Sequence, residues 1–167
     1  MESALKALAY AIEMEKEGEH FYRSNMDRVQ SPRVKMVFQE LADMEKEHYN
    51  LLLEQYRSLS EGGEWKDLKA IAQEQADKFI ERENQEKITK SELESSLGDI
   101  SVIRMAYLLE NDLAEYYLKL SIETEDRKGR EMLKTLSEWE IVHRNMLQAE
   151  YKDLMEDNWF DSGYAPY

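Results

Sequence analysis

The pattern of hydrophobic and polar positions predicts long amphipathic helices. Over most of the chain, apolar residues recur at intervals of three and four, which places them along one stripe of a helix. Helix-forming residues dominate, whereas the chain has only 6 glycines and 2 prolines to interrupt them. We therefore predict an all-α chain. One of its stripes comprises Val34, Val37, Phe38, Leu41, Leu52, Tyr56 and Leu59.

Breaker residues divide the chain into two helical hairpins. Ser31 suits an N-cap and Pro32 the first position of a helix. The segment "EGG" after Ser60 stops that helix, and Gly98 precedes the next one. The segment "RKGRE" around Gly129 marks the turn into a last helix. We predict hairpins over residues 3–60 and 99–157, with helices over 3–29, 32–60, 99–125 and from the turn at 129 to 157, and a non-helical aromatic tail over 158–167.

The connection between the hairpins, residues 61–98, is long enough to travel the length of a bundle, which leaves the second and third helices parallel. Its segment "EWKDLKAIAQEQADKFIEREN" carries apolar residues at helical spacing, so we predict an extra helix there. "SELE" at residues 91–94 matches a capping box, a motif of low specificity. A chain of 167 residues suits one core. We therefore treat residues 1–167 as a single domain.

One pattern of chemically active residues occurs twice, and each copy contains a glutamate, a tyrosine and a Glu-x-x-His motif. Residues three apart lie on nearly the same face of a helix, so the Glu and His of each motif can reach one metal ion side by side. Four carboxylates and two imidazoles from a duplicated helical hairpin make up the ligand set of a two-metal centre in a four-helix bundle. The copies are Glu15, Tyr22, Glu45 and His48, then Glu110, Tyr117, Glu140 and His143, and each pair differs by 95 (110 − 15, 117 − 22, 140 − 45, 143 − 48).

These polar residues lie within apolar stripes that must be buried. An ionised carboxylate buried without a partner costs several kcal/mol or is neutralised by a pKa shift. Two divalent cations would balance four such charges. In the alternative interpretation the motifs arise by chance, because 36 acidic residues generate many pairs. Each Glu would then be a solvated surface residue and each His a satisfied core group. That interpretation leaves the shared offset and the apolar flanks unexplained.

Four further polar side chains lie in or near these motifs, namely Glu19, His20 and the two tyrosines. Glu19 lies one turn after Glu15 and is a candidate for an added ligand or a carboxylate at the ion entrance. The residue 95 positions later, its repeat mate, is Ala114, so the repeat gives no support for a ligand at this place. His20 has no partner motif, so we predict that it lies on the surface. The two tyrosines are either large core residues or partners of the ligands. Because a buried phenol needs a polar partner, the second role is favoured.

Composition excludes several classes of function. The net charge of −14 argues against binding to nucleic acid or to an anionic membrane surface. No apolar run approaches the roughly 20 residues that span a bilayer. The first segment has acidic residues too early for a secretory signal. The absence of cysteine excludes disulfides, thiolate zinc sites and iron–sulfur clusters within this chain. We expect a cytoplasmic protein.

The hairpins resemble the ferritin-like diiron-carboxylate superfamily, and most of all its rubrerythrin-type branch. The resemblance rests on "MEKEGEHFY" in the first helix and "MEKEH" in the second, and covers residues 5–57 and 100–155. It implies a ferritin-like four-helix bundle with two iron ions per chain, although Mn and Zn also accept such ligands. It further implies Glu15 and Glu110 as single carboxylate ligands, Glu45 and Glu140 as bridges, His48 and His143 as terminal ligands, and Tyr22 and Tyr117 as hydrogen-bond partners of ligand carboxylates across a pseudo-two-fold axis.

The chain departs from rubrerythrin proper in two respects. Rubrerythrins carry a further Glu three residues after the ligand of the third helix, and their redox-linked exchange of a His for a Glu ligand involves it. Leu113 stands at that position here, and its repeat mate is Gly18. Rubrerythrins also often carry a four-cysteine rubredoxin domain as electron donor. Without cysteine, this chain needs a separate donor.

Three functions from different classes are consistent with these residues. The resemblance favours a redox enzyme that reduces peroxide or O2 over an enzyme that oxidises hydrocarbons. We expect it to form a homodimer. A protein that binds, oxidises and stores iron is the first alternative. A structural bundle that holds a redox-silent metal is the second. For the aromatic tail, folding over the bundle and packing against a partner subunit both stay open.

Overall fold

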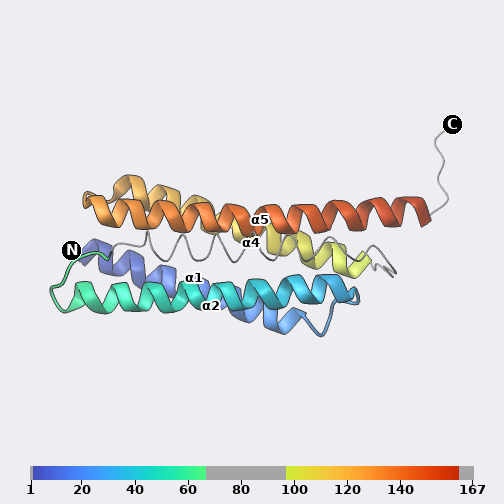
Figure 1. The fold of residues 1–167 in the computed structure, drawn as a ribbon, viewed down its shortest axis with the longest axis horizontal. Coiled ribbons are helices and arrows are strands. Elements are labelled where there is room, and N and C mark those ends of the chain that lie inside the picture. The colour runs from blue at the N-terminus through green and yellow to red at the C-terminus, as the bar shows by residue number, and fades with distance from the viewer. Residues whose placement is uncertain (1, 67–96, 162–167) are drawn as a thin grey trace.

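The computed structural model describes residues 2–66 and 97–161, and every element in these two ranges is an α-helix. Helices α1 (Glu2–Asn25) and α2 (Pro32–Ser60) form one antiparallel hairpin, and α4 (Leu97–Glu123) and α5 (Arg127–Asp161) form the other (Figure 1). Figure 1 also shows α2 and α4 running in the same direction. The predicted all-α, ferritin-like four-helix bundle is thus confirmed.

The α1–α2 connection is longer than a helix ending at residue 29 would leave it, because α1 ends four residues earlier. Helix α1 ends at Asn25, whose carbonyl accepts hydrogen bonds from the backbone N–H groups of Arg28 and Val29. This turn buries Val29 in the core, which is why the apolar pattern made the helix look longer. Helix α2 has the predicted bounds, and the Ser31 hydroxyl accepts a hydrogen bond from the Val34 N–H.

The turn into α5 lies earlier than predicted. Helix α5 begins at Arg127, so Gly129 belongs to its first turn. The Asp126 carboxylate accepts a hydrogen bond from the Gly129 N–H at 2.9 Å and caps the helix. Asp126 is the repeat mate of the N-cap Ser31 (126 − 31 = 95). The offset that relates the glutamates and histidines therefore also relates the two caps.

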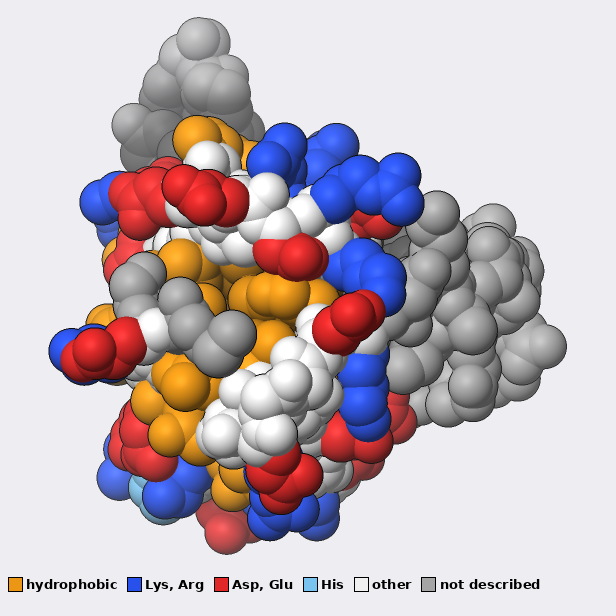
Figure 2. Space-filling model, turned by 90° about the vertical axis from the view of Figure 1, so that its left-hand side faces the viewer, with side chains coloured by type: hydrophobic (Ala, Val, Ile, Leu, Met, Phe, Trp, Pro, Cys, Tyr) orange, Lys and Arg blue, Asp and Glu red, His pale blue; other side chains and the backbone are white. Residues whose placement is uncertain are grey.

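Gly129 is a glycine because Trp65 lies against it. Figure 2 views the end of the bundle that carries this turn, where a hollow with a hydrophobic floor is rimmed by charged side chains. Trp65 lines the hollow beside Leu59 and Leu120. A Cβ atom at residue 129 would lie 2.5 Å from Cε2 of the Trp65 ring, which is a clash.

Replacing Gly129 by alanine is expected to destabilise the protein, although alanine is the better helix former by about 1 kcal/mol. Overpacking a filled site typically costs about 1–3 kcal/mol, so we expect a net loss of about 1 kcal/mol. Urea unfolding followed by circular dichroism measures it. The control is Lys134→Ala, an exposed position of the same helix, which should stay within about 0.5 kcal/mol. A more stable Gly129→Ala protein would contradict this account of Trp65.

The end of α5 also differs from the prediction. The helix continues to Asp161, so residues 158–161, predicted as part of a non-helical tail, are helical. Residues 162–167, the extra crossover helix and the capping box at 91–94 lie outside the described residues. None of the described helices is long and apolar enough to cross a membrane.

Two clusters of buried side chains fill the bundle, one toward each end. Along α2, Leu41 belongs to one cluster and Leu52 to the other. Along α5, Leu136 and Leu147 mark the same two clusters in the opposite order. The Glu-x-x-His motif of each helix lies between its two leucines. The polar residues therefore meet at the middle of the bundle, between two apolar layers.

Polar contacts fix the two hairpins against each other. The buried Asp99 carboxylate on α4 accepts hydrogen bonds from the backbone N–H groups of Gln30 and Ser31, at 2.9 and 2.8 Å. Arg33 on α2 donates to the buried Glu150 carboxylate on α5 at 2.7 Å. These contacts join the start of α2 to both helices of the second hairpin. They therefore limit sliding of one hairpin along the other.

Candidate metal centre

All four described helices contribute to one buried cluster of carboxylates and imidazoles. Helices α1 and α4 each supply one glutamate, and α2 and α5 each supply a Glu-x-x-His motif. None of these side chains is more than 2% exposed. The members of this central cluster are Glu15, Glu45, His48, Glu110, Glu140 and His143.

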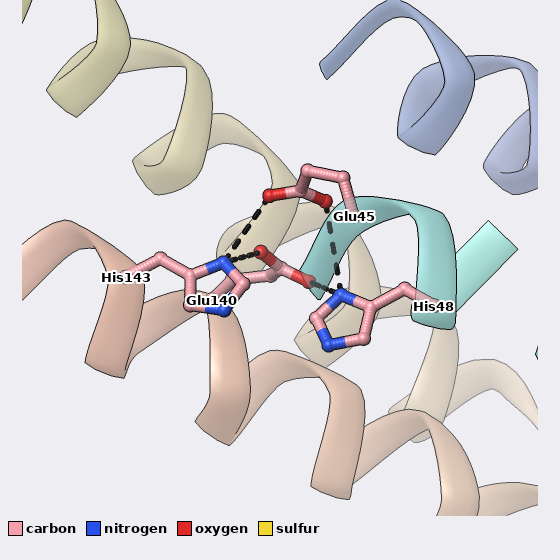
Figure 3. Close-up of side chains that lie close together, drawn as sticks. All are labelled: Glu45, His48, Glu140 and His143. Atoms are coloured by element: carbon pink, nitrogen blue, oxygen red, sulfur yellow. Dashed lines mark hydrogen bonds and ion pairs between the residues drawn. The ribbon is translucent and has the colours of Figure 1, made fainter. Parts of the chain in front are cut away.

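The imidazole of His48 faces three carboxylates through Nδ1. This atom lies 3.0 Å from Oε1 of Glu140, 3.5 Å from Oε2 of Glu15 and 3.7 Å from Oε2 of Glu45. Figure 3 shows the Glu45 and Glu140 carboxylates between the two imidazoles. Because three acidic groups point at one nitrogen, His48 and its neighbours enclose a position that suits a cation.

His143 repeats this arrangement on the other side of the cluster. Its Nδ1 lies 3.2 Å from Oε1 of Glu45, 3.2 Å from Oε2 of Glu140 and 3.4 Å from Oε2 of Glu110. Glu45 and Glu140 therefore each turn one oxygen toward His48 and the other toward His143 (Figure 3). The remaining two glutamates each face only one histidine.

Each of these outer glutamates is also held by a tyrosine from the opposite hairpin. The Tyr22 hydroxyl of α1 donates a hydrogen bond to Oε1 of Glu110, and the Tyr117 hydroxyl of α4 donates to Oε1 of Glu15. All four groups are fully buried. In each carboxylate the tyrosine occupies one oxygen, which leaves Oε2 aimed at the imidazole.

Burial and mutual repulsion shift the pKa values of the outer glutamates. Burial raises the pKa of Glu15 and of Glu110 well above the ordinary range, and the nearby carboxylates of Glu140 and Glu45 raise the two values further. Burial also raises the pKa of Tyr22 and Tyr117, reinforced by the carboxylate that each tyrosine bonds. The phenols therefore keep their protons at neutral pH.

The pKa values of the two histidines, and of the glutamates Glu45 and Glu140 that face both of them (the shared glutamates), shift opposite to the direction that burial alone would cause. Burial alone would lower the pKa of His48 and His143, but the Glu140 carboxylate beside each raises it well above the ordinary range. Burial would raise the pKa of Glu45 and Glu140, but the hydrogen bonds to Glu45 and the imidazolium charges beside Glu140 lower it. Without a metal ion, protons on the imidazoles thus balance the shared carboxylates.

The side chains of the cluster leave several buried polar atoms without hydrogen bonds, and a metal ion would satisfy these atoms. In the part of the chain that the structure describes, Oε2 of Glu15, Glu45 and Glu110, both oxygens of Glu140 and Nδ1 of His48 are buried without a well-formed hydrogen bond. Buried polar atoms are almost always satisfied, so a set that converges on one place indicates a missing charge. Carboxylate and imidazole ligands together suit iron, manganese or zinc. Ligand atoms of Glu45, His48, Glu140 and His143 all lie within 4.8 Å of one another.

The candidate ligand Glu19 does not join the cluster, and His20 lies on the surface as predicted. The Glu19 carboxylate accepts a hydrogen bond from Nε of Arg23 at 2.8 Å instead of facing the histidines. His20 is exposed, with its ring near the Ser24 hydroxyl. Sequence reasoning missed Trp139, whose indole stacks on the His48 ring with centroids 5.1 Å apart. Its place next to Glu140 was visible in the sequence, but its contact with another helix was not.

The comparison with protein families agrees with this geometry. The family model described as Rubrerythrin matches residues 6–151, which include both hairpins. The chain belongs to the rubrerythrin family. Among solved structures, this rubrerythrin-family protein is similar to a hypothetical protein from Pyrococcus furiosus, with a TM-score of 0.67 and 27% sequence identity over 93% of this chain and 90% of that one. None of the curated proteins matches it. Family and cluster together support a diiron-carboxylate protein.

Proposed function

We propose that this rubrerythrin-family protein holds two iron ions in the central cluster and reduces peroxide with electrons from a separate donor. One observation carries the proposal: Glu45 and Glu140 each turn one oxygen toward each histidine. A carboxylate in that position can bridge two ions, which in two-metal sites lie roughly 3.5–4 Å apart. Each imidazole also has an outer glutamate of its own, Glu15 for His48 and Glu110 for His143, which favours two ion positions over one.

The other residues have distinct tasks in this proposal. His48 and His143 each complete one ion position through Nδ1, and Glu15 and Glu110 each supply one oxygen to the same positions. Tyr22 and Tyr117 hold those two outer carboxylates in place across the bundle. When bound there, two ferrous ions would supply the two electrons needed to convert one hydrogen peroxide and two protons into two waters. The apolar layers on both sides exclude bulk water from the cluster.

The electron donor in this proposal is a separate molecule. The chain contains no cysteine, so it has no rubredoxin-type centre of its own. A family resemblance alone does not distinguish peroxide reduction from ferroxidation followed by storage. The two functions differ in the amount of iron that is oxidised per chain, and this difference can be measured.

Oxidation of the reduced, iron-loaded protein by hydrogen peroxide is expected to be fast, and oxidation by O2 slower. Anaerobic stopped-flow mixing, monitored by the ferric absorbance, gives both rates. Free ferrous iron in the same buffer and the Glu45→Gln protein serve as controls. If neither oxidant acts faster on the protein than on free iron, the redox proposal is wrong. Uptake and oxidation of many more than two irons per chain would instead indicate storage.

A further inference from the structure

The central cluster divides into two half-sites that share Glu45 and Glu140. The first half-site consists of Glu15 and His48, and Tyr117 bonds its glutamate. The second half-site consists of Glu110 and His143, and Tyr22 bonds its glutamate in the same way. The hydrogen bonds are thus symmetric, and any difference between the half-sites must come from the residues packed around them.

An indole ring supports only the first half-site. The Trp139 ring is nearly parallel to the His48 ring, with an interplanar angle of 14° and centroids 5.1 Å apart. Among the described residues, the only ring that stacks on His143 is that of His48, at 5.2 Å and 6°. The repeat mate of Trp139 is Met44 (139 − 95 = 44), which has no ring. The pseudo-two-fold symmetry is therefore broken beside the histidines.

The difference between Trp139 and Met44 affects the metal affinity of each half-site. A stacked indole restricts rotation of the His48 imidazole, so less conformational freedom is lost when Nδ1 binds a metal. Residues that orient a ligand typically change metal affinity by about 10- to 100-fold when replaced. Methionine, the residue at the mate position, is unbranched and flexible and has no ring to stack on His143. The surroundings of the second half-site thus hold their ligands less firmly.

We propose that the two half-sites fill in order, because Trp139 holds the first half-site in its binding geometry whereas Met44 leaves the second free to rearrange. The first half-site then binds the tighter ion, and the second binds the weaker and more exchangeable one. Trp139 acts as a positioning residue through His48. The inference rests on the proposed function, since it requires that the cluster bind two ions.

Titration of the metal-free protein with Co²⁺ alone tests the order of filling. Calorimetry should show two steps, with the first at least about tenfold tighter than the second. His143→Ala and His48→Ala are matched variants, 95 residues apart, that each damage one half-site. The His143→Ala protein should keep the tight step, and the His48→Ala protein should lose it. Two equal steps in the wild type, or equal affinities in the two variants, would overturn the proposal.

Three further variants test the role of Trp139. Trp139→Leu should weaken the first step about tenfold and alter the visible absorption of the first Co²⁺ equivalent only. Trp139→Phe should restore both, and Met44→Leu at the mate position should change neither. Thermal unfolding of each metal-free variant checks that it folds. An unaltered first step in Trp139→Leu would rule out the positioning role. A wild-type protein that binds no Co²⁺ at all would instead refute the proposed metal centre.

Discussion

Replacing either shared glutamate by glutamine is expected to reduce the metal content from two ions per chain to one or none. Glu45 and Glu140 each face both histidines, so each is the only group of its helix that can contribute to both ion positions. Glutamine keeps the shape of the side chain but removes its charge and one ligand oxygen. Each variant therefore loses a bridge, and the cation positions lose one of four balancing charges.

Matched controls separate this effect from a general loss of acidity. Glu47→Gln on α2 and Glu138→Gln on α5 remove the same charge at exposed positions one and two residues from the cluster (48 − 47 and 140 − 138). Elemental analysis after iron loading and gel filtration should give wild-type metal content for both controls. Wild-type content in both Glu45→Gln and Glu140→Gln would show that neither residue bridges two ions.

The metal-free protein is expected to lose stability as the pH rises from about 5 to about 9, whereas the metal-loaded protein keeps it. His48 and His143 have a pKa raised by folding, so the stability they contribute is fully present below the unfolded pKa of about 6.5 and is lost as the pH rises through the folded pKa. The raised pKa of Glu15 and Glu110 acts in the same direction. In each case the folded state at high pH holds buried carboxylates without their compensating protons.

The acid side of the profile should depend on other groups. Folding lowers the pKa of Glu45 and Glu140, so their contribution is present above an unfolded pKa of about 4.3 and is lost as the pH falls through the folded pKa. The metal-free protein should therefore be most stable in mildly acidic solution. A bound metal replaces the protons, and at 100 times its dissociation constant it adds about 2.7 kcal/mol.

Melting temperatures across this pH range, with excess chelator and with Fe²⁺ under nitrogen, measure both curves. The double variant Glu15→Gln/Glu110→Gln provides the internal control. Glutamine still accepts the tyrosine hydrogen bond but has no proton to lose, so the alkaline decline of the metal-free protein should become shallower. Identical profiles with chelator and with iron would contradict the assignment of the cluster as a metal centre.

The sequence by itself determined the helices and the face on which each polar group lies. The bounds of α2 follow from Ser31, Pro32 and the "EGG" stop, all of which act through local backbone hydrogen bonds and dihedral preferences. The spacing within Glu-x-x-His sets both side chains on one face for the same local reason. A constant offset between two copies then required that the copies meet. Each of these inferences depends only on residues a few positions apart or on the repeat itself.

Only the tertiary structure decided which groups touch across the bundle. Asn25 ends α1 because the turn behind it buries Val29, and residue 129 is a glycine because Trp65 from another segment occupies the space of a side chain. The stacking of Trp139 on His48 joins α5 to α2 and has no counterpart in the repeat. Such contacts depend on the distance and rotation between whole helices, which are set by the summed packing of many side chains. Helical periodicity places a residue on one face of its helix, but the packing of the two hairpins determines which residues that face contacts.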